Sequence, residues 1–268
     1  MKREYNRLLC DRRGTDGEVL WITLNNEKMM NSLTETMQTE LCEVLTDAAA
    51  DSGIRCLVLT GAGETAFCSG GDIRLFQQLD NVSGYDFLYG RGNSIQHLIS
   101  YMEKPVVAAV NGMCFAGGLE LALVCDFIYA TESAAFGLLE INLGVLAGWG
   151  GTVRLPRAIP AARAKEMIYR GEVIGAAEAL RLGLVNRVLP GRAELHAAVE
   201  ETTAEMMSKP PLALRAAKNV VNNSLTCESI EAALAIERGS IMWLISSEDS
   251  KEGISAFVEK RAGHYKGR

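Results

Sequence analysis

Two glutamates lie in apolar surroundings within the stretch from Asn111 to Thr152, and each is close to glycines. Glu120 stands within Gly-Gly-Leu-Glu-Leu-Ala-Leu, and Glu140 comes shortly after Ala135-Phe136-Gly137. Burial in such surroundings raises the pKa of a carboxyl group toward the range useful for proton transfer. The pair therefore indicates acid and base catalysis. Taken singly, Glu120 also suits a structural place in the first turn of a helix, and Glu140 suits a solvated loop.

Two glycine turns could supply backbone N–H groups to the same site. One is Ser69-Gly70-Gly71-Asp72 and the other is Gly117-Gly118. If their N–H groups converge, they form an oxyanion hole, and the donor at Gly117 gains from the positive end of the helix behind it. Such a site polarises a carbonyl oxygen. With two carboxylates nearby, the chemistry that follows is proton transfer and water addition at carbons next to that carbonyl.

The elements around this stretch position both glutamates. Leu119 to Cys125 is an apolar run of good helix formers, so Gly117-Gly118 should start a helix with Glu120 in its first turn. Asp126 to Ala130 and Ala135 to Gly137 favour short strands, which places Glu140 just after a strand. Gly148, Gly150 and Gly151 should open the next helix.

Upstream, strands alternate with helices, and helices fill the last part of the chain. We expect strands at residues 19–24, 56–60 and 106–110. A helix should follow a capping box at Ser32-Leu33-Thr34-Glu35, and another should surround Ile95 to Met102 and stop before Pro105. Helices are expected at 161–169, at 176–182 and from there to the end, which makes an α/β protein.

A competing glycine motif is the segment Gly61 to Ala66, which matches the GxGxxA form of a dinucleotide-binding fingerprint, with Asp80 about twenty positions further on. Dinucleotide binding requires the glycines to open a helix whose N-terminus holds the pyrophosphate. Here the segment continues into Phe67-Cys68-Ser69-Gly70-Gly71, so a dehydrogenase is disfavoured.

Composition limits the class of protein. The 268 residues are 48% hydrophobic with a formal charge of −6, which allows a large core and argues against a general nucleic-acid or membrane-surface binder. The 7 cysteines have no CxxC spacing and fit reduced thiols in a cytoplasmic protein. No secretory signal or membrane-spanning run is expected, and the three histidines match no metal site.

The ordered set of motifs resembles the crotonase, or enoyl-CoA hydratase/isomerase, superfamily. The matching segments cover nearly the whole chain: FCSGGDI (67–73), NGMCFAGGLELALVCDF (111–127), FGLLEINLGVLAGWGGTVRLPR (136–157), GLVNRVLP (183–190) and SKEGISAFVEKR (250–261). The resemblance implies a spiral of repeated ββα units at residues 1–200 and a C-terminal helical trimerisation region at 201–268. It also implies a homotrimer or homohexamer.

The resemblance assigns roles to matching positions. Glu120 and Glu140 would be the catalytic acid and base, and the N–H groups of Ser69 and Gly117 would hold the thioester oxygen. The Gly148 N–H would help to hold the attacking water. The substrate would be an acyl-CoA, with no metal and no separate cofactor. Its CoA part would lie along Lys28, Met29, Met30, Gly70, Gly71, Asp72 and Ile73. Lys260 or Arg261 would either meet a CoA phosphate or lie on a solvated face.

The function that we expect is reversible hydration of a 2-enoyl-CoA. Alternatives within the superfamily are a double-bond isomerase using chiefly Glu140, and a CoA-thioester hydrolase or decarboxylase; a protein that binds CoA without turnover is a further one. Two carboxylates favour hydration because water activation benefits from the second. Trp149 departs from the usual small residue, so its indole would either line the acyl pocket or pack in the core or trimer interface.

Overall fold

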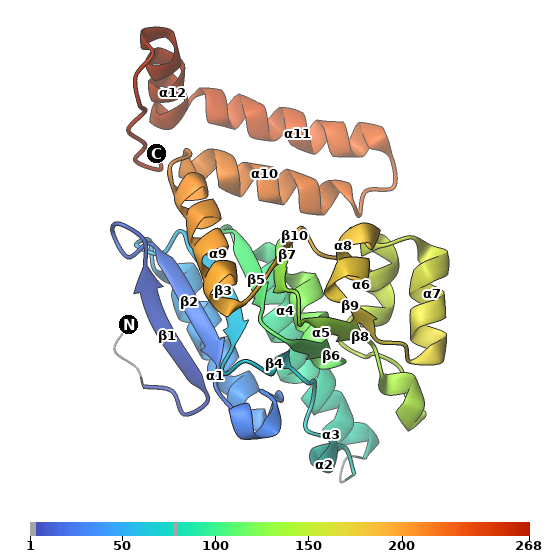
Figure 1. The fold of residues 1–268 in the computed structure, drawn as a ribbon. Helices are drawn as coiled ribbons and strands as arrows, with labels where there is room; N and C mark the ends of the chain where they lie inside the picture. The colour runs from blue at the N-terminus through green and yellow to red at the C-terminus, as the bar shows by residue number, and fades with distance from the viewer. Residues whose placement is uncertain (1–3, 78–79) are drawn as a thin grey trace.

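The structure is a computed structural model that describes residues 4–77 and 80–268 (Figure 1). Within these residues, the larger sheet has six strands, in the spatial order β1 (Leu8–Arg13), β2 (Val19–Leu24), β3 (Cys56–Gly61), β5 (Val106–Val110), β7 (Phe127–Thr131) and β10 (Arg187–Leu189). The smaller sheet has four, in the order β4 (Ala66–Cys68), β6 (Met113–Phe115), β8 (Ala135–Gly137) and β9 (Ile174–Gly175).

The chain adds one strand to each sheet in turn, because β3 is followed by β4, β5 by β6, and β7 by β8. Strands β2, β3, β5, β7 and β10 pair in parallel, and so do β4, β6 and β8. Parallel strands need a crossover connection, and the helices α4 (Gly92–Tyr101), α5 (Gly117–Val124) and α6 (Gly151–Ala158) lie in these connections. The expected α/β spiral of ββα units is confirmed.

Helices cover both faces of the larger sheet, which explains why its strands are continuous apolar runs. On one face, Leu57 and Leu59 of β3 pack with residues of α1 (Glu35–Ala50) and α4. On the other, Cys56 and Val58 pack with Leu195 and other residues of α9 (Arg192–Met207). Figure 1 shows α9 lying across this second face. The strands predicted at 19–24, 56–60 and 106–110 are therefore confirmed.

The N-cap of α1 lies two residues later than the capping box predicted from the sequence. Thr34, not Ser32, is the N-cap, and its hydroxyl accepts a hydrogen bond from the Met37 N–H (3.3 Å). Ser32 is buried before the helix, where its N–H donates to Met29 O (3.0 Å). The segment before the helix is thus folded back on the short 3₁₀ helix η1 (Glu27–Met29).

The segment from Gly61 to Ala66 forms no phosphate-binding helix. β3 ends at Gly61, Gly63 turns the chain with φ +72°, and β4 begins at Ala66. The Asn111 side chain accepts the Gly61 N–H (2.9 Å) and donates to Gly63 O (2.8 Å). The turn therefore joins the two sheets, and the dinucleotide hypothesis loses its structural basis.

Several shorter elements connect the strands and the longer helices. Before α4 come α2 (Ile73–Phe76), α3 (Asn81–Tyr85) and the π-helical turn η2 (Asp86–Arg91). After β8 come the 3₁₀ helix η3 (Glu140–Leu143), then α7 (Ala161–Arg170) and α8 (Ala176–Leu182) beyond α6. The helices predicted at 161–169 and 176–182 are confirmed.

The C-terminal helices are α10 (Pro211–Ser224), α11 (Ile230–Ile245) and α12 (Glu248–Glu259), and they extend away from the sheets (Figure 1). The boundary predicted between residues 200 and 201 falls inside α9. Because α9 packs Leu195, Val199 and Met207 into the core, that helix belongs with the sheets. Pro210-Pro211 separates α9 from α10 and is the better division.

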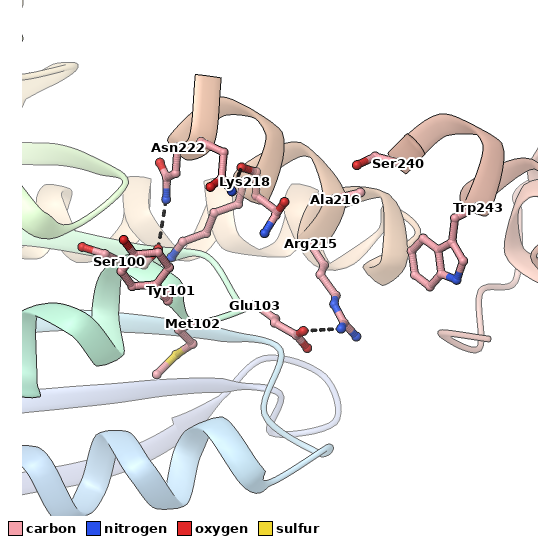
Figure 2. Close-up of a pocket in the computed structure, with 12 residues that line it drawn as sticks. Ser100, Tyr101, Met102, Glu103, Arg215, Ala216, Lys218, Asn222, Ser240 and Trp243 are labelled. Carbon is pink, nitrogen blue, oxygen red and sulfur yellow. Dashed lines mark hydrogen bonds and ion pairs between the residues drawn. The ribbon is translucent and has the colours of Figure 1, made fainter. Parts of the chain in front are cut away.

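Polar contacts fasten α10 to the end of α4 (Figure 2). Lys218 Nζ donates to the carbonyl oxygens of Ile99 (3.0 Å) and Lys104 (3.0 Å) and pairs with Asp126 Oδ2 (2.9 Å). The Asn222 amide donates to the carbonyl oxygen of Ser100 (3.0 Å). Among the described residues, no helix has both the length and the apolar character needed to cross a membrane, and the seven cysteines are free thiols.

Candidate active site

Helix α5 begins where strand β6 ends, in a tight and strained turn. Ala116 has φ +50° and ψ −126°, a backbone conformation that is costly for a residue with a Cβ. Gly118 lies so close to β4 that a Cβ there would overlap the Cys68 carbonyl group. The close approach explains why Gly-Gly opens this helix, and it places Glu120 in the first turn as predicted.

Glu120 is almost fully buried, with 3% of its surface exposed. Its Oε1 accepts hydrogen bonds from the backbone N–H groups of Trp149 (2.7 Å) and Gly151 (2.8 Å). Gly151 is the first residue of α6, and Gly150 before it has φ +94°. The glycines expected to open α6 therefore present two N–H groups to the carboxylate of Glu120, which the sequence did not reveal.

The environment of Glu120 keeps its proton affinity high. Burial raises its pKa to about 7, while the Gly151 N–H lowers the pKa, the charge of Glu140 raises it, and the Trp149 N–H and Arg154 lower it. A carboxyl group with a pKa near neutrality exchanges protons readily at physiological pH. The interaction with Glu140 also means that the two carboxylates share one electrostatic environment.

Glu140 begins η3, just after β8, and is half-buried. Burial raises its pKa, which the backbone N–H groups of Glu140 and Leu139 partly counteract. Its Oε2 is buried and has no hydrogen-bond partner among the described residues. A buried polar oxygen without a partner costs free energy and is typical of a group that meets a ligand.

The oxyanion hole differs from the prediction at one of its two amides. The Ser69 N–H already donates to Met30 O (3.0 Å), so it is not available to a ligand. Gly70 follows with φ +103°, and the next nitrogen, that of Gly71, lies 3.5 Å from the point where a Cβ of Gly117 would stand. Within the described chain, the N–H groups of Gly71 and Gly117 have no protein acceptor. Gly71 therefore replaces Ser69 as the candidate donor beside Gly117.

The two segments predicted to contact CoA lie side by side. Ser69 bonds to Met30, and the Leu33 N–H donates to Gly70 O (2.8 Å). Met30 and Ile73 are both exposed, as a ligand-contacting surface requires. Asp72 caps α2, because its Oδ1 accepts the Arg74 N–H (3.0 Å). The structure thus brings Lys28 to Met30 and Gly70 to Ile73 together, and their contact with CoA stays a prediction.

Two further predicted residues lie in the loop between η3 and α6. The Leu88 side chain lies 3.7 Å from the point where a Cβ of Gly148 would stand, and the Gly148 N–H as a water ligand stays a prediction. The Trp149 indole is 5% exposed and packs against Gly92, where a Cβ would overlap the ring. The indole therefore belongs to the core under the site, and its place as an open wall of the acyl pocket is not supported.

At the C-terminus, Arg261 already has acidic partners. It pairs with Glu252 (2.6 Å) and with Glu259 (2.7 Å), both on α12. These pairs raise the pKa of Arg261 and lower that of Glu252 to about 2. This arrangement supports the solvated-face alternative for the basic pair in this chain.

The assembled site can carry out proton transfer next to a carbonyl group. Two unpaired amides, of Gly71 and Gly117, can hold an oxygen that becomes negatively charged. Burial raises the pKa of both carboxylates, to about 7 for Glu120, which suits them to giving and taking protons. Two N–H donors hold Oε1 of Glu120, whereas Oε2 of Glu140 has no hydrogen-bond partner among the described residues, so the proton affinities of the two carboxylates are set differently.

Comparisons with known proteins agree with this chemistry. Residues 14–268 match the family described as Enoyl-CoA hydratase/isomerase. The chain is 36% identical to a short-chain-enoyl-CoA hydratase of Clostridium acetobutylicum over 96% of this chain and 97% of that protein. It is 38% identical to a crotonyl-CoA hydratase of Syntrophomonas wolfei, over 90% and 92% of the two chains. The structure of an enoyl-CoA hydratase from Bacillus anthracis superposes with a TM-score of 0.93 at 36% identity, covering 98% of this chain and 100% of that one.

Proposed function

We propose that Glu120 and Glu140 catalyse the addition of water to a short 2-enoyl-CoA. The chain belongs to the enoyl-CoA hydratase/isomerase family and is an enoyl-CoA hydratase. The observation that carries this proposal is the unequal pair of carboxylates. Glu120 accepts two backbone N–H groups, whereas Glu140 has a buried oxygen without a partner among the described residues.

Glu120 is the base in this proposal. Hydrogen bonds from N–H groups favour the ionised form of a carboxyl group. With a pKa of about 7, Glu120 is partly ionised at neutral pH and still basic enough to take a proton from water. The Gly148 N–H, one residue before the turn that holds Glu120, would help to orient that water.

Glu140 is the acid that serves C2. Burial raises its pKa, and among the described residues its Oε2 meets no donor that would stabilise a negative charge there. Both features favour the protonated form. The titrations of the two carboxylates are coupled, because the charge of Glu140 raises the pKa of Glu120 and, by reciprocity, a charge on Glu120 favours a proton on Glu140.

The proposed reaction balances as follows. The N–H groups of Gly71 and Gly117 bind the thioester oxygen and draw electrons from the C2=C3 bond. Glu120 removes a proton from water while the oxygen of that water bonds to C3. The electron pair of the double bond moves to C2, which takes the proton of Glu140. The reverse sequence eliminates water, and solvent exchange returns the protons to their starting places.

A short acyl chain is the proposed substrate. The names of two relatives specify short-chain enoyl-CoA and crotonyl-CoA. The Leu88 side chain lies 3.7 Å from the point where a Cβ of Gly148 would stand, so a bulky side chain stands close to the proposed water site. The CoA part would follow Lys28 to Met30 and Gly70 to Ile73.

We also propose a homotrimer, or a hexamer made of two trimers. α11 and α12 expose large apolar side chains, among them Met242 (65%), Trp243 (50%), Ile254 (63%) and Phe257 (85%). Large apolar side chains exposed on neighbouring helices favour an interface with another subunit. Seven free thiols support a reducing compartment, and we propose the cytoplasm.

Two reactions of one protein test the proposed roles. Hydration is followed with crotonyl-CoA by the loss of enoyl-thioester absorbance and by product mass. Exchange of the C2 proton is followed with butyryl-CoA in D₂O, a substrate that cannot be hydrated. Glu120→Gln should lower hydration by about 10²–10⁴ and keep the exchange, whereas Glu140→Gln should lose both. Hydration at a near-normal rate in Glu120→Gln, or exchange in Glu140→Gln, would contradict the assignment.

A further inference from the structure

The turn Trp149–Gly151, which donates hydrogen bonds to Glu120, accepts hydrogen bonds from two other side chains. Trp149 and Gly151 donate their N–H groups to Glu120, and the carbonyl oxygen of Trp149 lies between them in the chain. That oxygen accepts hydrogen bonds from the Gln96 side-chain amide and from Arg154 Nη1 (3.1 Å). Arg154 Nη1 also donates to Gln96 Oε1 (2.7 Å). The two side chains thus form a closed polar triangle with the turn.

Burial of the polar side chains of Gln96 and Arg154 beside the turn Trp149–Gly151 costs free energy. Gln96 is buried, with 7% of its surface exposed, although it is polar. Arg154 is half-buried, and none of the ion pairs in the described part of the chain involves it. Burial lowers the pKa of Arg154, and the charge of Glu120 raises it. An arginine placed in this way without a bonded carboxylate is a poor choice for stability alone.

We propose that Gln96 and Arg154 form a brace that fixes the turn Trp149–Gly151 and so positions the Glu120 carboxylate for the hydration step. The inference rests on the role proposed above for Glu120. Both side chains are positioning residues, since they contact the turn and not the reacting atoms.

The turn needs such support because it is rich in glycine. Gly148, Gly150 and Gly151 surround Trp149, and Gly150 has φ +94°. Glycine has the largest backbone freedom, so the N–H groups at 149 and 151 would otherwise sample several directions. Hydrogen bonds to the carbonyl oxygen of Trp149 fix the peptide plane between residues 149 and 150. The donors on either side of that plane then keep their direction toward Glu120 Oε1.

The brace also carries a charge. Arg154 lowers the pKa of Glu120, against the raising effects of burial and Glu140. The charged and titratable groups that act on Arg154 itself are Glu120, Arg157 and Tyr101. His97, Asp126 and Lys218 line the same groove between α4, α6 and α10. Removal of the Arg154 charge should therefore raise the pKa of Glu120 and move the acid limb of the pH profile to higher pH.

Three substitutions separate the geometry of the brace from its charge. Arg154→Met removes both, Arg154→Lys keeps the charge, and Gln96→Met removes hydrogen bonds without changing charge. Each is compared with Arg157→Met, which removes the same charge three residues later, where Arg157 Nη1 donates only to Val153 O (2.7 Å) of its own helix. The readouts are kcat and KM for crotonyl-CoA and the pH dependence of kcat/KM, with far-UV circular dichroism to monitor folding.

We expect Arg154→Met to lower kcat by about 10²-fold, with a smaller change in KM, because misplacement of a catalytic group costs about that much. Its acid limb should move to higher pH. Gln96→Met and Arg154→Lys should lower kcat and leave the limb in place. If Arg154→Met does not fold, these two variants decide the question.

The proposal is overturned if the brace variants keep kcat within about twofold of the Arg157→Met control while Glu120→Gln is inactive. In that case the role of Glu120 stands and the brace is only structural. If Glu120→Gln is itself active, the proposed catalytic role fails first. Equal losses of stability and activity without any shift of the pH limb in Arg154→Met would also count against the brace.

Discussion

Each end of helix α5 carries a carboxylate, almost fully buried at Glu120 and partly exposed at Asp126, and the two carboxylates have different partners. Glu120 lies in the first turn and receives only backbone N–H groups, whereas Asp126 follows the last turn and pairs with Lys218 (2.9 Å) and with the Val106 N–H (2.7 Å). Burial raises the pKa of both, and for Asp126 the Lys218 charge counteracts that effect. The comparison indicates that the carboxylate proposed for proton transfer has no cation in contact, whereas the carboxylate at the other end of the helix has one.

The largest difference between the two ends should appear in turnover. Glu120→Gln should lower kcat for crotonyl-CoA by about 10²–10⁴, because the base is lost. Asp126→Asn, a substitution of the same kind at the other end of α5, should leave kcat within about tenfold in folded protein. Equal losses in the two variants would show that the ends of α5 do not divide catalysis from structure.

The ion pair of Asp126 with Lys218, at the other end of α5, should contribute more to the free energy of unfolding than Glu120 does. Lys218→Met leaves the partly exposed Asp126 without its cation and removes the bonds to the carbonyl oxygens of Ile99 and Lys104, so the free energy of unfolding should fall by about 1.5–3 kcal/mol. The double variant Lys218→Met with Asp126→Asn should recover part of that loss. Urea unfolding at one fixed protein concentration measures both, and a loss below about 1 kcal/mol would contradict the comparison.

Burial of Glu120, at the start of α5, should reduce the stability of the folded protein at neutral and alkaline pH. Between pH 4.5 and about 7 the unfolded chain releases the Glu120 proton while the folded protein keeps it, so the free energy of unfolding falls as pH rises through that window. Above this window, the raised pKa of Glu120 lowers the free energy of unfolding by about 3 kcal/mol in total. Glu120→Gln should therefore be more stable than the parent at pH 8, with the difference disappearing toward pH 4, as measured by thermal unfolding at several pH values.

A smaller effect is expected at the turn that opens α5. Ala116 has φ +50° and ψ −126°, which glycine adopts at lower cost. Ala116→Gly should raise the free energy of unfolding by up to about 1 kcal/mol. Ala122→Gly, in a regular position later in the same helix, is the matched control and should lower it. A loss of stability in both variants would mean that the turn is not strained.

The sequence predicted the parts of the site that depend on local pattern. Glu120 in a first helical turn and Glu140 after a strand both followed from apolar surroundings and glycines. The buried strands β3 and β5 were found for the same reason. The three-residue strands β4 and β6 were missed, since they are too short for a periodicity and exist because they pair with each other.

The errors arose where tertiary contacts decide between neighbouring residues. Ser69 and Gly71 stand two positions apart in one glycine turn, and only the bond from Ser69 to Met30 shows which N–H group remains available. For Trp149 the sequence left two alternatives open, an acyl-pocket wall and packing in the core or trimer interface, and its contact with Gly92, 57 positions away in the chain, favours the core. Gln96 and Arg154 escaped notice because their shared acceptor, the carbonyl oxygen of Trp149, has no signature in the sequence.

One short helix carries both the amide proposed to bind the carbonyl oxygen and the proposed base, because Gly117 and Glu120 both lie in the first turn of α5, whose residues are nearly all buried. Exposed apolar side chains lie outside this helix, including Ile73, Tyr85, Leu143 and Leu146. Mutations of such exposed side chains should disturb the buried geometry of α5 little. Such a division makes the scaffold evolvable, since substrate preference can drift while the chemistry is inherited intact.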